Sequence, residues 1–265
     1  MGSILDEIIG HKRREVSERK ELYPTKLLEK SIYFESVPLS LRGYLRKPGA
    51  SGVIAEIKRA SPSKGDINPH ISVESLSVGY MQSGASALSV LTDTRFFKGA
   101  LEDLRTARRF NLCPILRKDF IIDPYQVIEA KSAGADVVLL IAAALKPDEL
   151  QELAKEARGL GMEVLMEVHN SMELDTHLCP AVSLVGVNNR NLKTFTVDAQ
   201  VSHELAGRIP GEFVKVSESG IFDVQVLTQL RRAGYEGFLI GEAFMSRSKP
   251  AMACRKFIEE LRRAE

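Results

Sequence analysis

Charged side chains crowd the segment EIKRASPSKG, Glu56 to Gly65, which directly follows the apolar run Val53 to Ala55. An unpaired charge at the end of a buried strand costs several kcal/mol unless it finds a partner or has a chemical role. A carboxylate and an amine two positions apart, Glu56 and Lys58, could exchange protons with a substrate or bind an anion. The segment therefore predicts a functional site.

The same change from apolar to polar residues ends four later runs, which finish in Lys118 and Asp119, Glu167 and His169, Asn188 to Arg190, and Glu218 and Ser219. Residues two positions apart on a strand share a face, so Glu56 and Lys58 should point the same way. If these faces meet, lysines, glutamates and an asparagine converge on one site. A network of structural ion pairs is the alternative interpretation of any single one of these residues.

Eight short apolar runs are candidates for the strands that carry these side chains: GVIAEIK, ALSVLTD, PILRKDF, DVVLLIA, EVLMEVH, LVGVNNR, FVKVSES and GFLIGEA. They alternate with segments of helical length, such as LEDLRTARRF, in which apolar residues recur at spacings of three and four. Eight such units in about 210 residues predict an α/β fold, a (β/α)8 TIM barrel whose active site lies at the C-terminal ends of the strands. An open doubly wound sheet is the alternative, but no GxGxxG follows the first run.

The residues before the first run predict a helical extension. The segment ILDEIIGHKRREVSERK can place one apolar face along a helix, formed by Ile4, Leu5, Ile8, Ile9 and Val16. Prolines at 24, 38 and 48 divide the residues after that segment. We therefore expect two or three helices from residues 1–47, packed as a lid over one end of a catalytic barrel formed by residues 48–265.

Glycines accompany the last two runs, in SESGI (Ser217 to Ile221) and LIGEAFM (Leu239 to Met245). In barrels of this kind, phosphate is commonly held by the loops after strands seven and eight and by a helix N-terminus. Each glycine alone could be an ordinary turn residue. Their position at these two strand ends favours a phosphate site.

The composition argues against several classes of partner. With 36 basic and 35 acidic residues the net charge is +1, which favours a small-molecule partner over nucleic acid or an anionic membrane. The three cysteines have no paired spacing and no HExxH occurs. The first residues lack the apolar core of a signal peptide, and no run approaches the roughly 18 apolar residues of a membrane span. We expect a cytoplasmic protein without bound metal or cofactor, as a monomer or weak homo-oligomer.

Eight segments, in order along the chain, resemble the indole-3-glycerol phosphate synthase family: EIKRASPSKG, LTDTRFFKGALEDL, PILRKDFIIDPYQ, AGADVVLLI, EVLMEVH, GVNNRNLKTF, VSESGI and LIGEAFM. That family is a (β/α)8 barrel with an N-terminal helical extension. The resemblance implies a carboxy-lyase of tryptophan biosynthesis that uses no metal or cofactor. Its substrate, 1-(2-carboxyphenylamino)-1-deoxyribulose 5-phosphate, undergoes ring closure, decarboxylation and dehydration to indole-3-glycerol phosphate.

The resemblance also implies roles for the residues at the strand ends. Lys118 is the expected general acid of ring closure, and Lys58 would contact the substrate carboxylate, serve as a candidate acid of dehydration and, as a neighbouring cation, ease proton release from Lys118. Glu167 is the expected base of dehydration. Glu56 would orient the lysines, and Asn188 would hold a sugar hydroxyl.

Substrate binding is implied for a further set of positions: Arg190, Glu218, Ser61, Ser219, Gly220, Gly241, Glu242, Phe97, Phe120 and Leu139. Ser61 and the backbone amides near Ser219, Gly220, Gly241 and Glu242 would bind the phosphate. Because a carboxylate repels phosphate, only the backbone N–H of Glu242 is expected to contribute. Phe97, Phe120 and Leu139 would form an apolar wall for the aromatic ring, or could be ordinary core.

Residues 61–65 are expected to form a mobile loop after the first strand, with Lys64 as a solvated charge. The rival interpretations are a related phosphate-binding barrel, such as phosphoribosylanthranilate isomerase or a Schiff-base aldolase, and a barrel that binds without catalysis.

Overall fold

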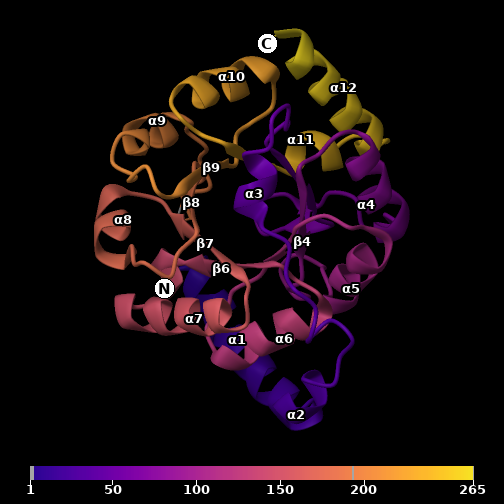
Figure 1. Cartoon of the computed structure of the whole chain (residues 1–265), viewed down its shortest axis with the longest axis vertical. Helices are drawn as coiled ribbons and strands as arrows, with labels where there is room; N and C mark the ends of the chain where they lie inside the picture. The colour runs from indigo at the N-terminus through magenta and orange to yellow at the C-terminus, as the bar shows by residue number, and fades with distance from the viewer. Residues whose placement is uncertain (1–2, 193, 265) are drawn as a thin grey trace.

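Eight parallel strands close into a barrel in the computed structural model, which describes residues 3–192 and 194–264 (Figure 1). Their order around the barrel is β1-β10-β9-β8-β7-β6-β5-β4. The strands are β1 (Val53–Ile57), β4 (Ala87–Leu91), β5 (Ile115–Lys118), β6 (Val137–Ile141), β7 (Glu163–Val168), β8 (Leu184–Asn188), β9 (Val214–Glu218) and β10 (Gly237–Ile240). Each lies in one of the apolar runs, so the predicted (β/α)8 barrel is confirmed.

Helices follow the strands and form the outer ring visible in Figure 1. They are α4 (Val73–Gln82), α5 (Leu101–Phe110), α6 (Pro124–Ala133), η1 (Ala142–Ala144), α7 (Pro147–Gly159), α8 (Ser171–His177), α9 (Gln200–Ala206), α10 (Val224–Arg232), α11 (Glu242–Met245) and α12 (Pro250–Ala264). Helix α6 shows why such segments begin and end where they do. Asp123 caps its first turn by accepting from the N–H of Tyr125, Pro124 stands where no N–H is needed, and Gly134 ends it at a φ of 88°.

The core has two layers because successive strand residues point to opposite faces of the sheet. In β6, Leu139 packs inside the barrel with Leu116 and Leu165, whereas Leu140 packs outward among the helices. All three inward leucines are buried. The barrel is thus filled by side chains below the rim that carries the polar strand ends.

The N-terminal extension contacts both ends of the barrel. In the described residues before β1 it forms three helices, α1 (Ile4–Leu22), α2 (Thr25–Leu28) and α3 (Leu41–Leu45). Helix α3 closes the N-terminal end, where Leu41 and Leu45 join the inner core cluster, and it lies over the centre of the barrel in Figure 1. Helix α1 instead reaches the opposite, C-terminal end. The expectation of a lid over one end was therefore incomplete.

The segment expected to be a mobile loop after β1 contains a short antiparallel pair. Strand β2 (Ala60–Ser61) pairs with β3 (Gly65–Asp66), with Ser61 opposite Gly65. This pairing joins the two ends of the loop to each other in a two-stranded sheet separate from the barrel. Among the described helices none has the length and apolarity to cross a membrane.

Candidate active site

A cavity opens at the C-terminal ends of the strands, with about 1190 Å³ of space when its mouth is included. All of the residues predicted for the site line it: Glu56, Lys58, Ser61, Phe97, Lys118, Phe120, Leu139, Glu167, Asn188, Arg190, Glu218, Ser219, Gly220, Gly241 and Glu242. They come from the strand ends and their loops, because parallel strands deliver their carboxyl ends to the same rim.

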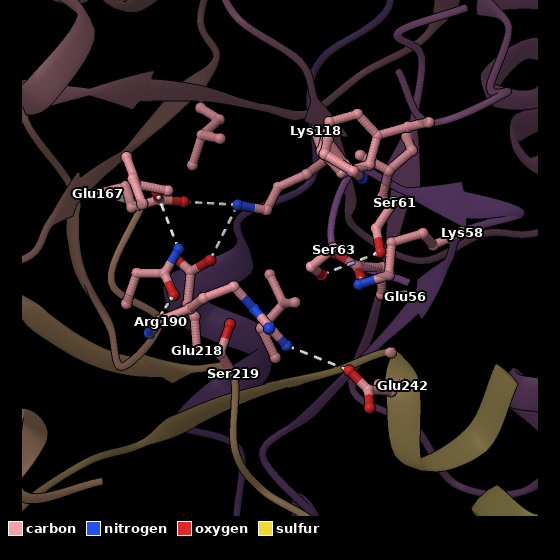
Figure 2. Close-up of a pocket in the computed structure, with 18 of the residues that line it drawn as sticks. Glu56, Lys58, Ser61, Ser63, Lys118, Glu167, Arg190, Glu218, Ser219 and Glu242 are labelled. Carbon is pink, nitrogen blue, oxygen red and sulfur yellow. Dashed lines mark hydrogen bonds and ion pairs between the residues drawn. The ribbon is translucent and has the colours of Figure 1, made fainter. Parts of the chain in front are cut away.

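Lys118 lies between two carboxylates. Its Nζ is 2.6 Å from Oε2 of Glu167 and 3.0 Å from Oε2 of Glu218, and the Lys118 side chain is 14 % exposed (Figure 2). Burial alone would lower the pKa of Lys118, but Glu167, Glu218 and Glu56 raise it well above its ordinary value. The expectation that Lys58 eases proton release from Lys118 is therefore wrong for the site without substrate. Lys58 pairs instead with Glu56, at 2.6 Å.

The two carboxylates that share Lys118 differ in charge state. Burial would raise the pKa of Glu167, but Lys118, His169 and the amide of Asn188 hold it below its ordinary value, with Asn188 Nδ2 donating to Oε1 at 3.1 Å. Burial, helped by the neighbouring Glu167 charge, raises the pKa of Glu218 to about 7 in spite of Lys118. Glu167 is thus ionised near neutral pH, whereas Glu218 can hold a proton there.

Two glycines make room for these carboxylates. A Cβ at Gly186 in β8 would collide with Oε1 of Glu218, and a Cβ at Gly241 after β10 would collide with Oε1 of Glu56. Any side chain at either position would displace a carboxylate from the cavity floor. Sequence reasoning identified Gly241 only as a phosphate position and missed Gly186.

The carboxylate of Glu242 faces two cations at the mouth of the cavity. Its Oε2 lies 3.1 Å from Nη2 of Arg190, and its Oε1 lies 3.3 Å from Nζ of Lys64 (Figure 2 shows the Arg190 contact). The Glu242 carboxylate is thus held by two cations at the mouth, and the expectation that only its backbone N–H contributes to phosphate binding stays a prediction. Lys64 is half-exposed, as expected of a loop charge, but it has this partner.

The segment after β9 presents its backbone to the same mouth. Ser219 and Gly220 both have positive φ, 64° and 78°. Both residues therefore depart from strand geometry at the point where they line the cavity. Ser61 lies across the mouth, where its Oγ is 3.3 Å from Oγ of Ser63.

An apolar wall stands beside the charged groups. The rings of Phe97 and Phe120 lie with their centroids 6.0 Å apart, and Leu139 lines the same cavity from the barrel interior. Helix α1 adds Ile4, Leu5 and Ile8 to the lining, which sequence reasoning had assigned only to a packing face. Leu139 also belongs to the inner core cluster, so it is a core residue that borders the cavity.

Lys12 of α1 is a functional candidate that sequence reasoning missed. It is fully buried, and its Nζ lies 2.9 Å from Asp93, 3.0 Å from Asp119 and 3.0 Å from Glu15. The sequence does contain a signal for it, because Lys12 stands four residues after Ile8 and so lies on the apolar face of the helix. A lysine at such a place requires buried carboxylates as partners.

The two aspartates that hold Lys12 also hold the aromatic wall. Asp93 Oδ1 accepts from the backbone N–H groups of Phe96, at 2.7 Å, and Phe97. Asp119, which directly follows Lys118, accepts a hydrogen bond from the backbone N–H of Phe120 at 2.8 Å. Lys12 therefore ties the N-terminal helix to both rings and to the end of β5.

Within residues 3–192 and 194–264 no group of three or more histidine, cysteine, aspartate or glutamate residues is arranged to hold a metal ion. The three cysteines are free.

Several solved structures have a similar fold. 3-Hexulose-6-phosphate synthase from Salmonella typhimurium matches with a TM-score of 0.63 at 11 % identity, covering 80 % of this chain and 99 % of that one. Tryptophan synthase subunit alpha from Legionella pneumophila matches with a TM-score of 0.59 at 15 % identity, covering 84 % and 97 %. At these identities the likeness shows the fold alone.

Sequence relatives are far closer. The model of the family described as indole-3-glycerol phosphate synthase matches residues 5–257. Proteins of that name from Bacteroides thetaiotaomicron and Bacillus cereus are 48 % and 46 % identical over 261 and 250 residues, covering 98 % and 94 % of this chain and 100 % and 95 % of their own. One from Dechloromonas aromatica is 44 % identical, covering 94 % of this chain and 97 % of its own. The chain therefore belongs to the indole-3-glycerol phosphate synthase family.

Proposed function

We propose that this cavity converts 1-(2-carboxyphenylamino)-1-deoxyribulose 5-phosphate to indole-3-glycerol phosphate, carbon dioxide and water, the reaction of its family in tryptophan biosynthesis. The observation that carries the proposal is the convergence of Lys118, Glu167 and Lys58 in one cavity that also has an apolar wall and a cationic mouth. The substrate has the matching parts, an aromatic ring, a carboxylate and a phosphate.

Ring closure needs an acid next to the ribulose carbonyl. Lys118 donates a proton to the carbonyl oxygen while the ring carbon that bears the carboxylate attacks the carbonyl carbon, and a carbon–carbon bond forms. Carbon dioxide then leaves, and the electron pair of the broken bond restores the aromatic ring. Lys58, 18 % exposed beside the cavity, binds the carboxylate before it leaves.

Dehydration needs an acid and a base on the closed ring. The hydroxyl leaves as water with a proton from Lys58, and Glu167 takes the proton whose electron pair forms the new double bond. Asn188 donates a hydrogen bond to Glu167 and lines the same cavity, where its amide would hold a sugar hydroxyl of the substrate. Glu218, protonated near neutral pH, leaves Lys118 with less negative charge around it, which favours release of its proton.

The remaining lining residues bind the ends of the substrate. Ser61 and the backbone amides of Ser219, Gly220, Gly241 and Glu242 are proposed to bind the phosphate, which takes the place of the Glu242 carboxylate on Arg190; all of these residues line the cavity. Phe97, Phe120 and Leu139 pack against the aromatic ring.

The test is to incubate the protein with the substrate and follow indole fluorescence. The chain contains no tryptophan, so the product is observed against a low protein background. Lys118→Ala and Glu167→Gln should each lower kcat by about 10² to 10⁴, the usual cost of losing a general acid or base. Lys20→Ala is the control and should keep full activity, because Lys20 is partly exposed and is not among the residues that line the cavity. A folded wild type without product formation would refute the proposal.

The family match disfavours the rival interpretations, phosphoribosylanthranilate isomerase and a Schiff-base aldolase. Borohydride added with substrate separates the aldolase directly, because an aldolase would be trapped as a lysine adduct and this protein should not be. We also propose a cytoplasmic monomer or weak homo-oligomer, which light scattering after gel filtration tests for the oligomeric state.

A further inference from the structure

The carboxylate of Glu167 has a third neighbour besides Lys118 and Asn188. Nε2 of His169 lies 3.5 Å from its Oε1, the oxygen that also accepts from Asn188. His169 directly follows β7, and its side chain is only 11 % exposed. It is not among the described residues that line the cavity. It therefore reaches Glu167 from behind, on the side away from the substrate.

Glu173 fixes the orientation of this imidazole. Its Oε2 lies 3.2 Å from Nδ1 of His169 and accepts from the backbone N–H of the same residue at 2.8 Å. Its other oxygen accepts from Nδ2 of Asn170 at 2.8 Å, and Asn170 caps α8, in whose first turn Glu173 lies. A carboxylate held at three points leaves the ring little freedom.

The other ring nitrogen of His169, Nε2, faces Glu167. Nε2 is buried and forms no hydrogen bond with any of the described residues, although buried polar atoms are nearly always paired. Its nearest acidic atom is Oε1 of Glu167, at a distance that a small movement of either side chain converts into a hydrogen bond. The line of groups runs from Glu173 through His169 to Glu167.

We propose that His169, clamped by Glu173, is a positioning residue that keeps the carboxylate of Glu167 negatively charged and oriented for proton removal. The proposal rests on the proposed function, in which Glu167 is the base of dehydration. A base must be free of a proton at the start of each turnover, and a cation behind it favours that state. Lys118 cannot serve this need throughout the cycle, because it gives up its own proton during ring closure.

The charges around His169 support its cationic form. Burial alone would lower the pKa of the imidazole, but the hydrogen bond to Glu173 and the charges of Glu167 and Glu218 raise it above its ordinary value. These three groups face the ring from α8, β7 and β9 respectively. Loss of the imidazole should in turn raise the pKa of Glu167, so the base would become protonated at a higher pH than in the wild type.

The experiment compares His169→Gln with His177→Gln in the full chain. Glutamine keeps a hydrogen-bonding side chain of similar length but carries no charge. His177 lies on the same helix as Glu173, where its ring contacts Thr176 and the carbonyl of Leu145, so it controls for loss of a histidine beside α8. The wild type is first shown to form the indole product, so that failure of the proposed function is recognised before any variant is judged.

We expect His169→Gln to lower kcat by about 10- to 100-fold, less than removal of the base itself, with KM nearly unchanged. The acidic limb of its kcat profile should move to higher pH. Glu173→Gln, which keeps an acceptor for the His169 N–H but loses the charge, should move the limb in the same direction. If both variants keep kcat within about twofold of wild type with an unmoved acidic limb, or if kcat falls no more than in His177→Gln, the proposal is overturned.

Discussion

Lys12→Met removes the buried amine that ties α1 to the cavity walls. In the wild type, Nζ lies 2.9 Å from Asp93 and 3.0 Å from Asp119, and all three side chains are out of reach of solvent. At an effective dielectric constant of about 20, each contact is worth roughly 5 to 6 kcal/mol of attraction, offset by the desolvation of the ions. Asp119 keeps Arg117 at 3.1 Å, so the uncompensated charge in the variant is mainly that of Asp93. We expect the free energy of unfolding to fall by about 3 to 5 kcal/mol.

Urea unfolding measures this loss, followed by circular dichroism and by tyrosine fluorescence, since the chain has six tyrosines and no tryptophan. Coincident curves from the two probes justify a two-state analysis. The matched control is Lys20→Met on the same helix, where Lys20 contacts Asp123 at 2.7 Å but both side chains are partly exposed, 47 % and 29 %. An exposed pair is worth about 0 to 1 kcal/mol. A loss in Lys12→Met no larger than in this control would refute the reasoning.

The same variant should change the pH dependence of stability in a defined direction. Burial would raise the pKa of Asp119, but Lys12 and Arg117 hold it well below its ordinary value of 3.8. A depressed carboxyl pKa contributes stability that is present above the ordinary value and is lost as the pH falls through the folded-state value. Without Lys12 part of this contribution is absent, so the difference between wild type and Lys12→Met should be largest at neutral pH and shrink below about pH 4.

Three further substitutions test the packing and the charges of the cavity. Gly186→Ala should lower the free energy of unfolding in urea by about 1 to 3 kcal/mol and should also lower kcat, because the added Cβ collides with Glu218. Gly207→Ala is the control and should change neither quantity, because no atom lies within 4 Å of the added Cβ. Glu218→Gln should flatten the pH dependence of unfolding. The pKa of Glu218 is raised to about 7, so its contribution to stability is full below about pH 4.5 and is lost as the pH rises through about 7. The free energy of unfolding of wild type and variant, measured at about pH 5 and pH 8, shows whether it changes less with pH in the variant. Glu242→Ser should lower KM by up to about tenfold, because Arg190 no longer exchanges a carboxylate for phosphate. Steady-state kinetics measures this change, and an unchanged KM would contradict it.

Hydrophobic periodicity was enough to predict the barrel, and strand-end chemistry was enough to predict that polar side chains from several strands meet at one rim. Runs such as DVVLLIA are apolar on both faces because a barrel strand is buried on both, and they became β1 and β4 to β10. Parallel strands end at one rim, so Glu56, Lys118 and Glu167 had to meet there once the alternation of strands and helices was recognised. These conclusions need only local patterns and one topological rule.

The pairing of charges within the site could not be predicted in this way. Whether the Lys58 amine lies next to Lys118 or next to Glu56 depends on side-chain conformation in the cavity, and in the structure it pairs with Glu56. The orientation of Glu242 is decided by Arg190, 52 residues earlier in the chain. Lys12 meets Asp93 through a helix outside the repeating pattern. Each of these contacts depends on side-chain positions that no periodicity encodes.

Two of the site cations already have one protein carboxylate each. Lys58 pairs with Glu56 and Arg190 with Glu242, at 2.6 and 3.1 Å. These pairs let the site fold without uncompensated charge. In the proposed reaction, the carboxylate of the substrate replaces Glu56 on Lys58 and its phosphate replaces Glu242 on Arg190. Its affinity is therefore the difference between two sets of ion pairs rather than the sum of the new contacts, which favours moderate binding at the two ends of the molecule.

Lys118 differs from these cations because it has two carboxylate partners, Glu167 and Glu218. An incoming anion would have to displace both, so Lys118 is poorly suited to bind the substrate carboxylate or phosphate. A neutral carbonyl oxygen can approach it without displacing either, and protonation of Glu218 then reduces the charge that retains the lysine proton. The count of partners thus supports the proposal that Lys58 and Arg190 bind the ends of the substrate and that Lys118 transfers a proton at its centre.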